Sequence, residues 1–199
     1  MFKKLFILTT FLVAGIAGYG QIVHPELMGQ KIAVAVKQEQ QLKSKIYKGG
    51  GDILTPKDMA FPIRYLREEK NIPNLIVQYT FSKNDSVIRN IEYEWDARNF
   101  NESDHNVKPI SFDKVLIERY NGLLAYFTKK YGPGTAKGDL TNLAKIDSLG
   151  GLTRTDKWNT NGQVDVLMYT AISNYHQAQP HAFRISTHRI RAYLAQPKK

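Results

Sequence analysis

The clearest pattern along the chain is an alternation of apolar and polar residues in two neighbouring segments. Apolar side chains occupy every second position of residues 75–81 and, except for Arg89, again of residues 87–95. A period of two is typical of a β-strand with one buried face. The polar stretch 82–86 suits a turn, so the two segments predict an antiparallel hairpin, and residues 63–66 are expected to add an edge strand.

A longer period predicts a helix between residues 111 and 131. Apolar residues recur there every three or four positions, which gives a helix one broad apolar face. Ser111 is expected to cap the helix, and Gly132-Pro133-Gly134 to end it. The apolar positions are Phe112, Val115, Leu116, Tyr120, Leu123, Leu124, Phe127 and Tyr131. Such a face needs an apolar surface to cover, and the hairpin provides one.

The segment before the first hairpin has a weaker helical pattern. Residues 25–47 carry an apolar stripe, and Pro25 suits a first helical position. We expect a helix over 25–47 that lies at the periphery of the domain. Residues 32–36 are compatible with a short strand instead. Three glycines, 49–51, end the element in either case.

Residues 154–194 again have a strand pattern. Residues 154–158 and 164–172 flank an Asn-Gly pair at 161–162, which is the strongest short-range signal for a hairpin turn. A final strand is expected over 183–194. The apolar parity changes along it, which indicates a β-bulge near residues 186–188.

The order α, ββ, α, βββ predicts an α+β fold. We expect an antiparallel sheet of about five to six strands with two helices packed on one side. Residues 21–199 are long enough for one domain of ordinary size. The sequence shows no internal repeat with a period of 20–50 residues.

The first twenty residues have the features of a cleavable secretory signal. Lys3 and Lys4 precede an apolar run, and small residues stand at positions 18 and 20, which predicts cleavage before Gln21. The apolar run is shorter than the roughly 20 residues that a membrane-spanning helix needs. No later segment is as apolar, so we expect a mature chain without a transmembrane helix, located in the periplasm or secreted.

Composition narrows the chemistry further. The chain contains no Cys, which excludes disulfides, thiolate metal sites and cysteine nucleophiles. Its formal net charge is +10, from 28 Lys and Arg against 18 Asp and Glu. A basic exported protein is attracted to polyanions. An envelope protein or a polyanionic glycan is therefore the expected partner, and nucleic acid is not.

Four residues are candidates for ligand contact. The inferred bulge would place Arg184, Arg189 and Arg191 on the outer face of the last strand as a basic stripe. Trp158 precedes the Asn-Gly turn, where an indole ring could stack on a ligand. Replacing the three arginines is expected to weaken binding of a polyanion without lowering stability.

No catalytic, metal or cofactor motif is evident. Glu92 and Glu94 stand side by side on one strand face, whereas catalytic carboxylates flank a substrate from two sides. The five histidines lack metal-ligand spacing, the Asp/Asn-rich stretch 96–106 lacks the register of a calcium loop, and Gly-x-Ser-x-Gly is absent. We therefore expect no catalytic residues, no metal and no cofactor.

A few features resemble small exported proteins of Bacteroidetes-type bacteria. These are the Tyr19-Gly20 ending before Gln21, the absence of Cys and the Lys-Tyr-Gly-Pro-Gly stretch at residues 130–134. The resemblance implies an envelope location and transfers no functional residue.

Three hypotheses for function follow. The leading one is a non-enzymatic binding domain of the cell envelope that contacts a protein or glycan through its sheet face or loops. The alternative is a hydrolase of envelope polymers whose site is assembled from distant loops, and a third is a structural subunit of an assembly. The residues that such a hydrolase would use are Asp96, Asp104, His105, His176 and His181.

Overall fold

The fold was analysed in a computed structural model. It describes residues 22–49, 55–99, 107–160, 162, 164–175, 177–179, 182–184 and 186–197, without the side chains of 177–179 and 182–184. The expected signal sequence, residues 1–20, lies outside the described residues.

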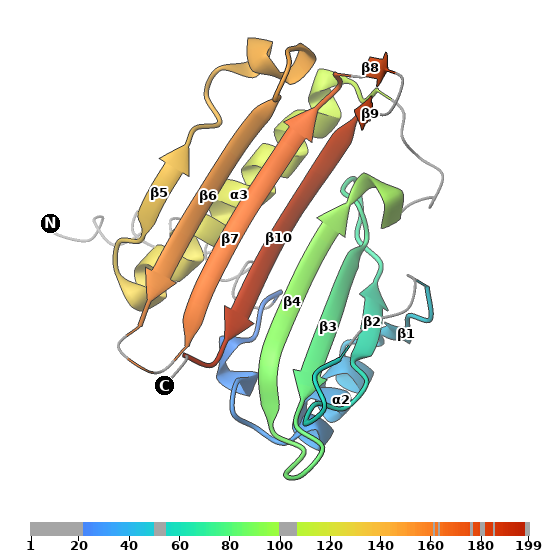
Figure 1. The fold of residues 1–199 in the computed structure, drawn as a ribbon, viewed down its shortest axis with the longest axis vertical. Coiled ribbons are helices and arrows are strands. Elements are labelled where there is room, and N and C mark those ends of the chain that lie inside the picture. The colour runs from blue at the N-terminus through green and yellow to red at the C-terminus, as the bar shows by residue number, and fades with distance from the viewer. Residues whose placement is uncertain are drawn as a thin grey trace, which may run out of the picture.

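The α+β class and the antiparallel sheet are confirmed, but the main sheet has eight strands instead of five to six (Figure 1). The first half of the chain contributes a 3₁₀ turn, a short helix and four strands. They are η1 (Pro25–Leu27), α2 (Ile32–Gln41), β1 (Lys45–Ile46), β2 (Ile63–Arg67), β3 (Leu75–Phe81) and β4 (Ile88–Asp96).

The second half repeats this order and adds a small hairpin. Its elements are η2 (Ala97–Asn99), α3 (Ile110–Tyr131), β5 (Thr135–Gly138), η3 (Leu143–Asp147), β6 (Leu152–Asn159), β7 (Asp165–Ser173), β8 (Gln177–Gln179), β9 (Ala182–Arg184) and β10 (Thr187–Ala195). Strands β8 and β9 pair only with each other and extend the β7–β10 hairpin beyond the main sheet; we call them the arm.

The strand order shows that the domain consists of two similar halves. It runs β1-β2-β3-β4-β10-β7-β6-β5, so each half is a four-stranded antiparallel meander and the two final strands meet at the centre. Strands β4 and β10 both have nine residues and pair antiparallel, with Tyr93 opposite Ala192 near the middle. The arrangement is that of a duplicated α-β-β-β-β unit with an approximate two-fold axis between β4 and β10.

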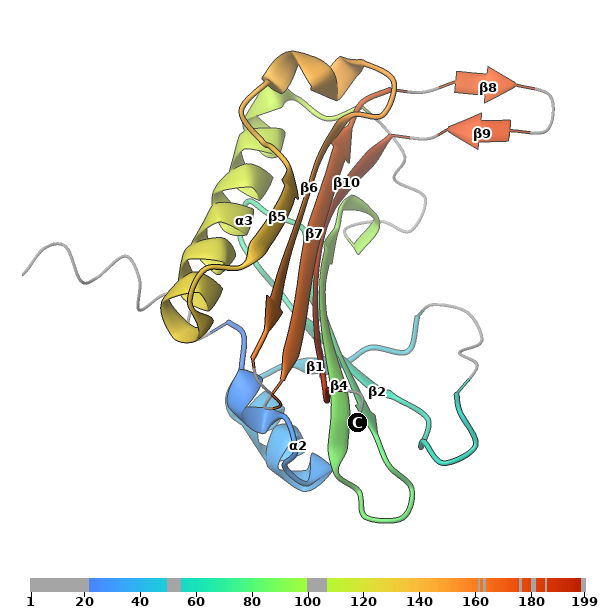
Figure 2. The ribbon, with the colours of Figure 1, turned by 60° about the vertical axis from the view of Figure 1, so that its left-hand side comes forward.

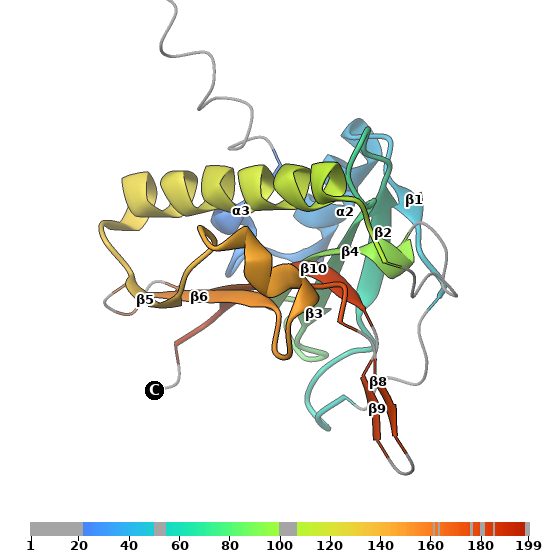
Figure 3. The same ribbon diagram turned by 90° about the horizontal axis from the view of Figure 1, so that it is seen from above.

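Both helices lie on the same side of the sheet, as Figures 2 and 3 show. The core fills the space between them and the sheet. Leu116, Leu123 and Phe127 of α3 are fully buried there, as expected from the helical period. On β10 the buried positions alternate from His188 to Leu194, so the odd-numbered residues face the other side. Neither α2 nor α3 covers that other side (Figure 3).

A polar contact joins the two halves on the side of the sheet that the helices cover. The indole nitrogen of Trp95 on β4 donates to Glu69, with Nε1 2.7 Å from Oε1, and Arg119 on α3 donates to the same carboxylate. The Arg119 guanidinium also lies 5.5 Å from the centre of the Trp95 ring. The long helix of the second half is thereby fixed to the first half.

Several expected boundaries were wrong. The helix expected over 25–47 is limited to η1 and α2, and its last residues form the edge strand β1. Pro109, not Ser111, caps α3, and it provides no side-chain hydrogen bond. The final strand is interrupted before residue 187, because the chain leaves the main sheet there to form the arm.

Within the described ranges, no helix combines the length and the apolar character that crossing a membrane requires.

Candidate binding surface on the open sheet face

The side of the sheet opposite the helices carries two continuous rows of side chains. We call this surface the open face. Strand pairing places one row across all eight strands and a second row across seven. The first is Lys45, Leu66, Ile76, Glu94, Arg191, Tyr169, Thr155 and Lys137; the second is Arg64, Gln78, Glu92, Tyr193, Leu167, Lys157 and Thr135.

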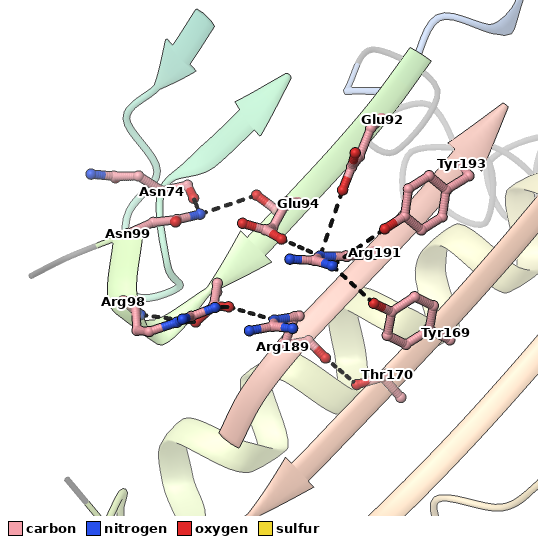
Figure 4. A network of polar contacts seen from close by, with 11 residues as sticks. Asn74, Glu92, Glu94, Arg98, Asn99, Tyr169, Thr170, Arg189, Arg191 and Tyr193 are labelled. Carbon is pink, nitrogen blue, oxygen red and sulfur yellow. Dashed lines mark hydrogen bonds and ion pairs between the residues drawn. The ribbon is translucent and has the colours of Figure 1, made fainter. Parts of the chain in front are cut away.

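Arg191 is the centre of the open face (Figure 4). Its Nε donates to Glu94 on the adjacent strand, and Glu92 lies 3.6 Å away. Its Nη1 lies 3.2 Å from the hydroxyl of Tyr169 and 3.3 Å from that of Tyr193. The two tyrosine rings stack with centroids 6.2 Å apart. Arg191 is thus held between two carboxylates and two phenols from three strands.

A second ion-pair group lies beside it. Arg189 Nε donates to Asp96, and Arg98 reaches the same carboxylate at 2.9 and 3.2 Å. The Asp96 side chain is only 5% exposed, so its carboxylate contacts the two arginines and very little solvent. The central strands β4 and β10 therefore supply opposite charges that neutralise each other.

Burial and neighbouring charges change the acidities of this cluster. Burial, together with the nearby carboxylate of Glu94, raises the pKa of Glu92, although Arg191 opposes the shift. Burial also raises the pKa of the Tyr193 phenol, and Glu92 adds to it. Burial acts against ionisation of Asp96 too, but Arg98 and Arg189 outweigh it and lower its pKa. At neutral pH Asp96 is ionised and Tyr193 is a neutral hydrogen-bonding group.

The basic stripe is only partly as expected. Arg189 and Arg191 share the outer face of β10, but they are about one-fifth to one-quarter exposed and each is paired with a carboxylate. Arg184 belongs to β9 of the arm and not to the same strand, and its side chain lies outside the described residues. The outward orientation expected for Arg189 and Arg191 is therefore observed, but both are members of ion pairs.

Trp158 is a core residue. Its side of β6 faces α3, and it is 2% exposed. The ring packs against Phe127 at a centroid distance of 5.4 Å, and its Nε1 donates to the carbonyl of Gly132 at 3.0 Å. Trp158 thus fastens the end of α3 to the sheet, and the suggestion that it stacks on a ligand is not supported.

Of the five residues of the hydrolase alternative, only Asp96 lies in the described part of the chain. Asp96 is already bonded to two arginines. The other four, Asp104, His105, His176 and His181, lie outside the described residues. Within the described ranges, no group of three or more His, Asp or Glu side chains is placed to hold a metal ion.

Tyr169 and Tyr193 were not identified from the sequence as part of a surface cluster. Their strands alternate as expected, and this alternation does assign both tyrosines to the outward face. The pairing of β10 with β4, which joins the two halves of the chain, was not predicted. A long-range pairing of this kind leaves no local signal.

Comparison of the chain with family models, with curated proteins and with solved structures finds no match.

Proposed function

We propose that this chain is a non-enzymatic binding domain, exported to the cell envelope, that binds a protein partner through the open face of its sheet. The observation that carries the proposal is the Arg191 cluster with its two tyrosines at the centre of a face that neither α2 nor α3 covers (Figure 3). Tyrosine and arginine dominate the energetically important positions of protein interfaces, since both combine apolar area with hydrogen-bonding groups.

The composition around the cluster supports a protein partner. Apolar side chains such as Leu66, Ile76 and Leu167 lie in the same two rows as the charged groups. An interface of this kind combines an apolar area with fixed polar contacts that set orientation. The arginine and tyrosine side chains are held in place before binding, which reduces the entropy lost on association.

Charge pairing argues against a polyanionic glycan as the ligand of the arginines at the centre of the open face. Arg98, Arg189 and Arg191 face Asp96, Glu92 and Glu94, so three positive charges meet three negative ones. A polyanion would have to displace carboxylates that are already bonded. Binding driven by release of counterions needs unpaired cations along the contact.

The proposal is tested with immobilised protein and an envelope extract. The wild type is compared with Tyr169→Ala and with Asn121→Ala, whose side chain is exposed on α3 on the opposite side of the molecule. We expect one protein to be retained by the wild type and Asn121→Ala and lost from Tyr169→Ala, with a weak dependence on salt.

The polyanion alternative is tested with heparin as the probe. Retention on heparin that falls steeply with salt and is lost in Arg191→Ala would contradict the proposal, because it would make the arginines a polyanion site. Retention of the same proteins from the extract by the wild type, Tyr169→Ala and Asn121→Ala would equally contradict it.

A further inference from the structure

A buried polar cluster holds the base of the arm. Strand β7 ends at Ser173 and β10 begins at Thr187, so the arm leaves the main sheet between Asn174 and Ser186. The Ser186 hydroxyl lies 3.2 Å from the carbonyl of Asn174 and closes this base. Figure 2 shows the arm extending away from the sheet on the side opposite α3, which is the side of the open face.

The side chain of Asn174 connects this base to two other segments. Its Oδ1 accepts from the backbone N–H of Lys108 at 2.8 Å and lies 3.1 Å from Nε2 of His188. Its Nδ2 donates to the Lys108 carbonyl at 3.1 Å and to Asp147 at 3.2 Å. The segment before α3, the turn η3 and the start of β10 are therefore tied together at one point.

Asp113 adds a carboxylate to this cluster. It lies in the first turn of α3, its side chain is fully buried, and its Oδ1 is 3.3 Å from Nε2 of His188. Within the described residues neither carboxylate oxygen receives a hydrogen bond of good geometry. Burial raises the pKa of Asp113 to about 6, and the nearby charge of Asp147 contributes.

We propose that Asp113 and His188 form a pH-responsive latch that holds the base of the arm firmly in mildly acidic conditions and less firmly in alkaline conditions. Nε2 of His188 lies 3.3 Å from Oδ1 of the buried Asp113 carboxyl, and a proton on that carboxyl keeps the site uncharged. Its loss leaves a net negative charge in a buried site beside Asp147, which is costly.

The direction of the effect follows from the carboxyl of Asp113. A carboxyl whose pKa is raised in the folded state contributes stability at acidic pH, and this contribution is lost as the pH rises through about 6. Among the described residues, Asp147 on η3 is the charge that acts on Asp113. The Nζ of Lys108 lies 5.5 Å from the ring of Phe112, which packs edge-on against the ring of His188.

The latch is tested by amide hydrogen exchange of the intact protein at about pH 4.5 and about pH 8, corrected for intrinsic rates. A single group with a pKa of about 6 changes the local opening equilibrium on the order of tenfold over this interval. We therefore expect protection at the ends of β7 and β10 that flank the arm to fall about tenfold at the higher pH. Protection in β3 serves as the internal reference for global unfolding.

Two variants make the test specific. Asp113→Asn should keep acid-like protection at both pH values, and Asp147→Asn should reduce the pH response. Asp165→Asn, at the opposite end of β7, is the control and should respond like the wild type. An equal pH response in the wild type and Asp113→Asn would overturn the latch. This outcome is independent of whether the open face binds a protein.

Discussion

The two halves of the domain share one order of elements but attach their helices to the sheet in different ways. The first half has a helix of 10 residues with only Ala35 and Glu39 buried, whereas the helix of the second half has 22 residues and a continuous apolar face. Because one of the two buried side chains of α2 is a carboxylate and the other is an alanine, this helix has little apolar surface to bury. The same topology is therefore stabilised in two ways: by a polar anchor, which is a buried charged side chain with its bonded partners, in the first half, and mainly by apolar packing in the second.

The polar anchor of the first half is centred on Glu39. Arg67 donates to both of its oxygens, at 2.5 and 3.0 Å, and the hydroxyls of Tyr79 and Ser44 donate to it at 2.5 Å each. The side chain of Glu39 is fully buried and that of Arg67 is 11% exposed. All three partners come from outside α2, so the carboxylate fixes the helix to the sheet and to the start of β1.

The second half contains a smaller version of this arrangement with the roles reversed. Here the helix provides the phenol: Tyr120 donates to Asp156 on β6 at 2.6 Å. Arg154 on the same strand donates to Asp156 at 2.8 and 3.0 Å. Because Leu116, Leu123 and Phe127 are also fully buried, this polar contact supplements the packing and does not replace it.

The largest effect is expected from removing the polar anchor. Glu39→Ala leaves the guanidinium of Arg67 buried without its partner and should lower the free energy of unfolding by about 3–5 kcal/mol. Urea denaturation of this variant and of Gln40→Ala, an exposed neighbour on the same helix, provides the measurement. If Glu39→Ala unfolded at the same urea concentration as Gln40→Ala, the polar anchor would not be needed.

In the second half the corresponding test removes packing. Leu123→Ala deletes a fully buried side chain between α3 and the sheet and should cost about 2–5 kcal/mol. The exposed Asn121 of the same helix provides the matched control, Asn121→Ala, in thermal denaturation. Equal melting temperatures for the two variants would show that the apolar face of α3 is assigned wrongly.

A direct comparison of the halves uses the two phenols. Tyr79→Phe removes one donor to Glu39, and Tyr120→Phe removes one donor to Asp156. In each case a buried carboxylate keeps its arginine, so we expect similar losses of about 1.5–3 kcal/mol. A much larger loss for one of them in denaturant titrations would show that the two anchors are not equivalent.

The smallest expected effect is a difference in pH dependence. Burial opposes ionisation of Glu39, but the hydrogen bonds and charge of Arg67 outweigh it and lower the pKa of Glu39 below 4.5. Its stabilisation is therefore present above that value and is lost as the pH falls, with a slope of at most about 1.4 kcal/mol per pH unit for one proton.

Unfolding free energies of the wild type and Glu39→Ala between about pH 2.5 and about pH 6 provide the check. The variant should lose less stability than the wild type on the acidic side. A variant with the same acid dependence would assign that dependence to other carboxylates, for example Asp96.

Sequence patterns predicted the elements with strong local periodicity and missed those defined by distant partners. The period of two identified β3, β4, β6 and β7, and the helical period identified α3. The edge strands β1 and β5 have two and four residues, too few to establish a period. The duplication was missed because its halves share an order of elements and not a residue pattern.

The candidate surface was predictable only in part for the same reason. The outward orientation of Arg189 and Arg191 follows from alternation along one strand. Their pairing with Asp96 and Glu94 depends on which strand lies beside β10, and the partners are 93 and 97 positions apart in the sequence. Trp158 was expected at the surface and is buried. Its position beside a turn in the sequence gives no indication that the end of α3 covers it.

The proposal that the open face is a protein-binding surface is tested most directly by site-specific photo-crosslinking in the envelope. A photoreactive residue is placed at Thr155, which lies opposite Tyr169 on the open face, and separately at Asn121 on the exposed side of α3. The account predicts one protein adduct from position 155 that disappears when Arg191→Ala is added, and none from position 121. Adducts of equal yield from both positions, or none from position 155, would contradict it.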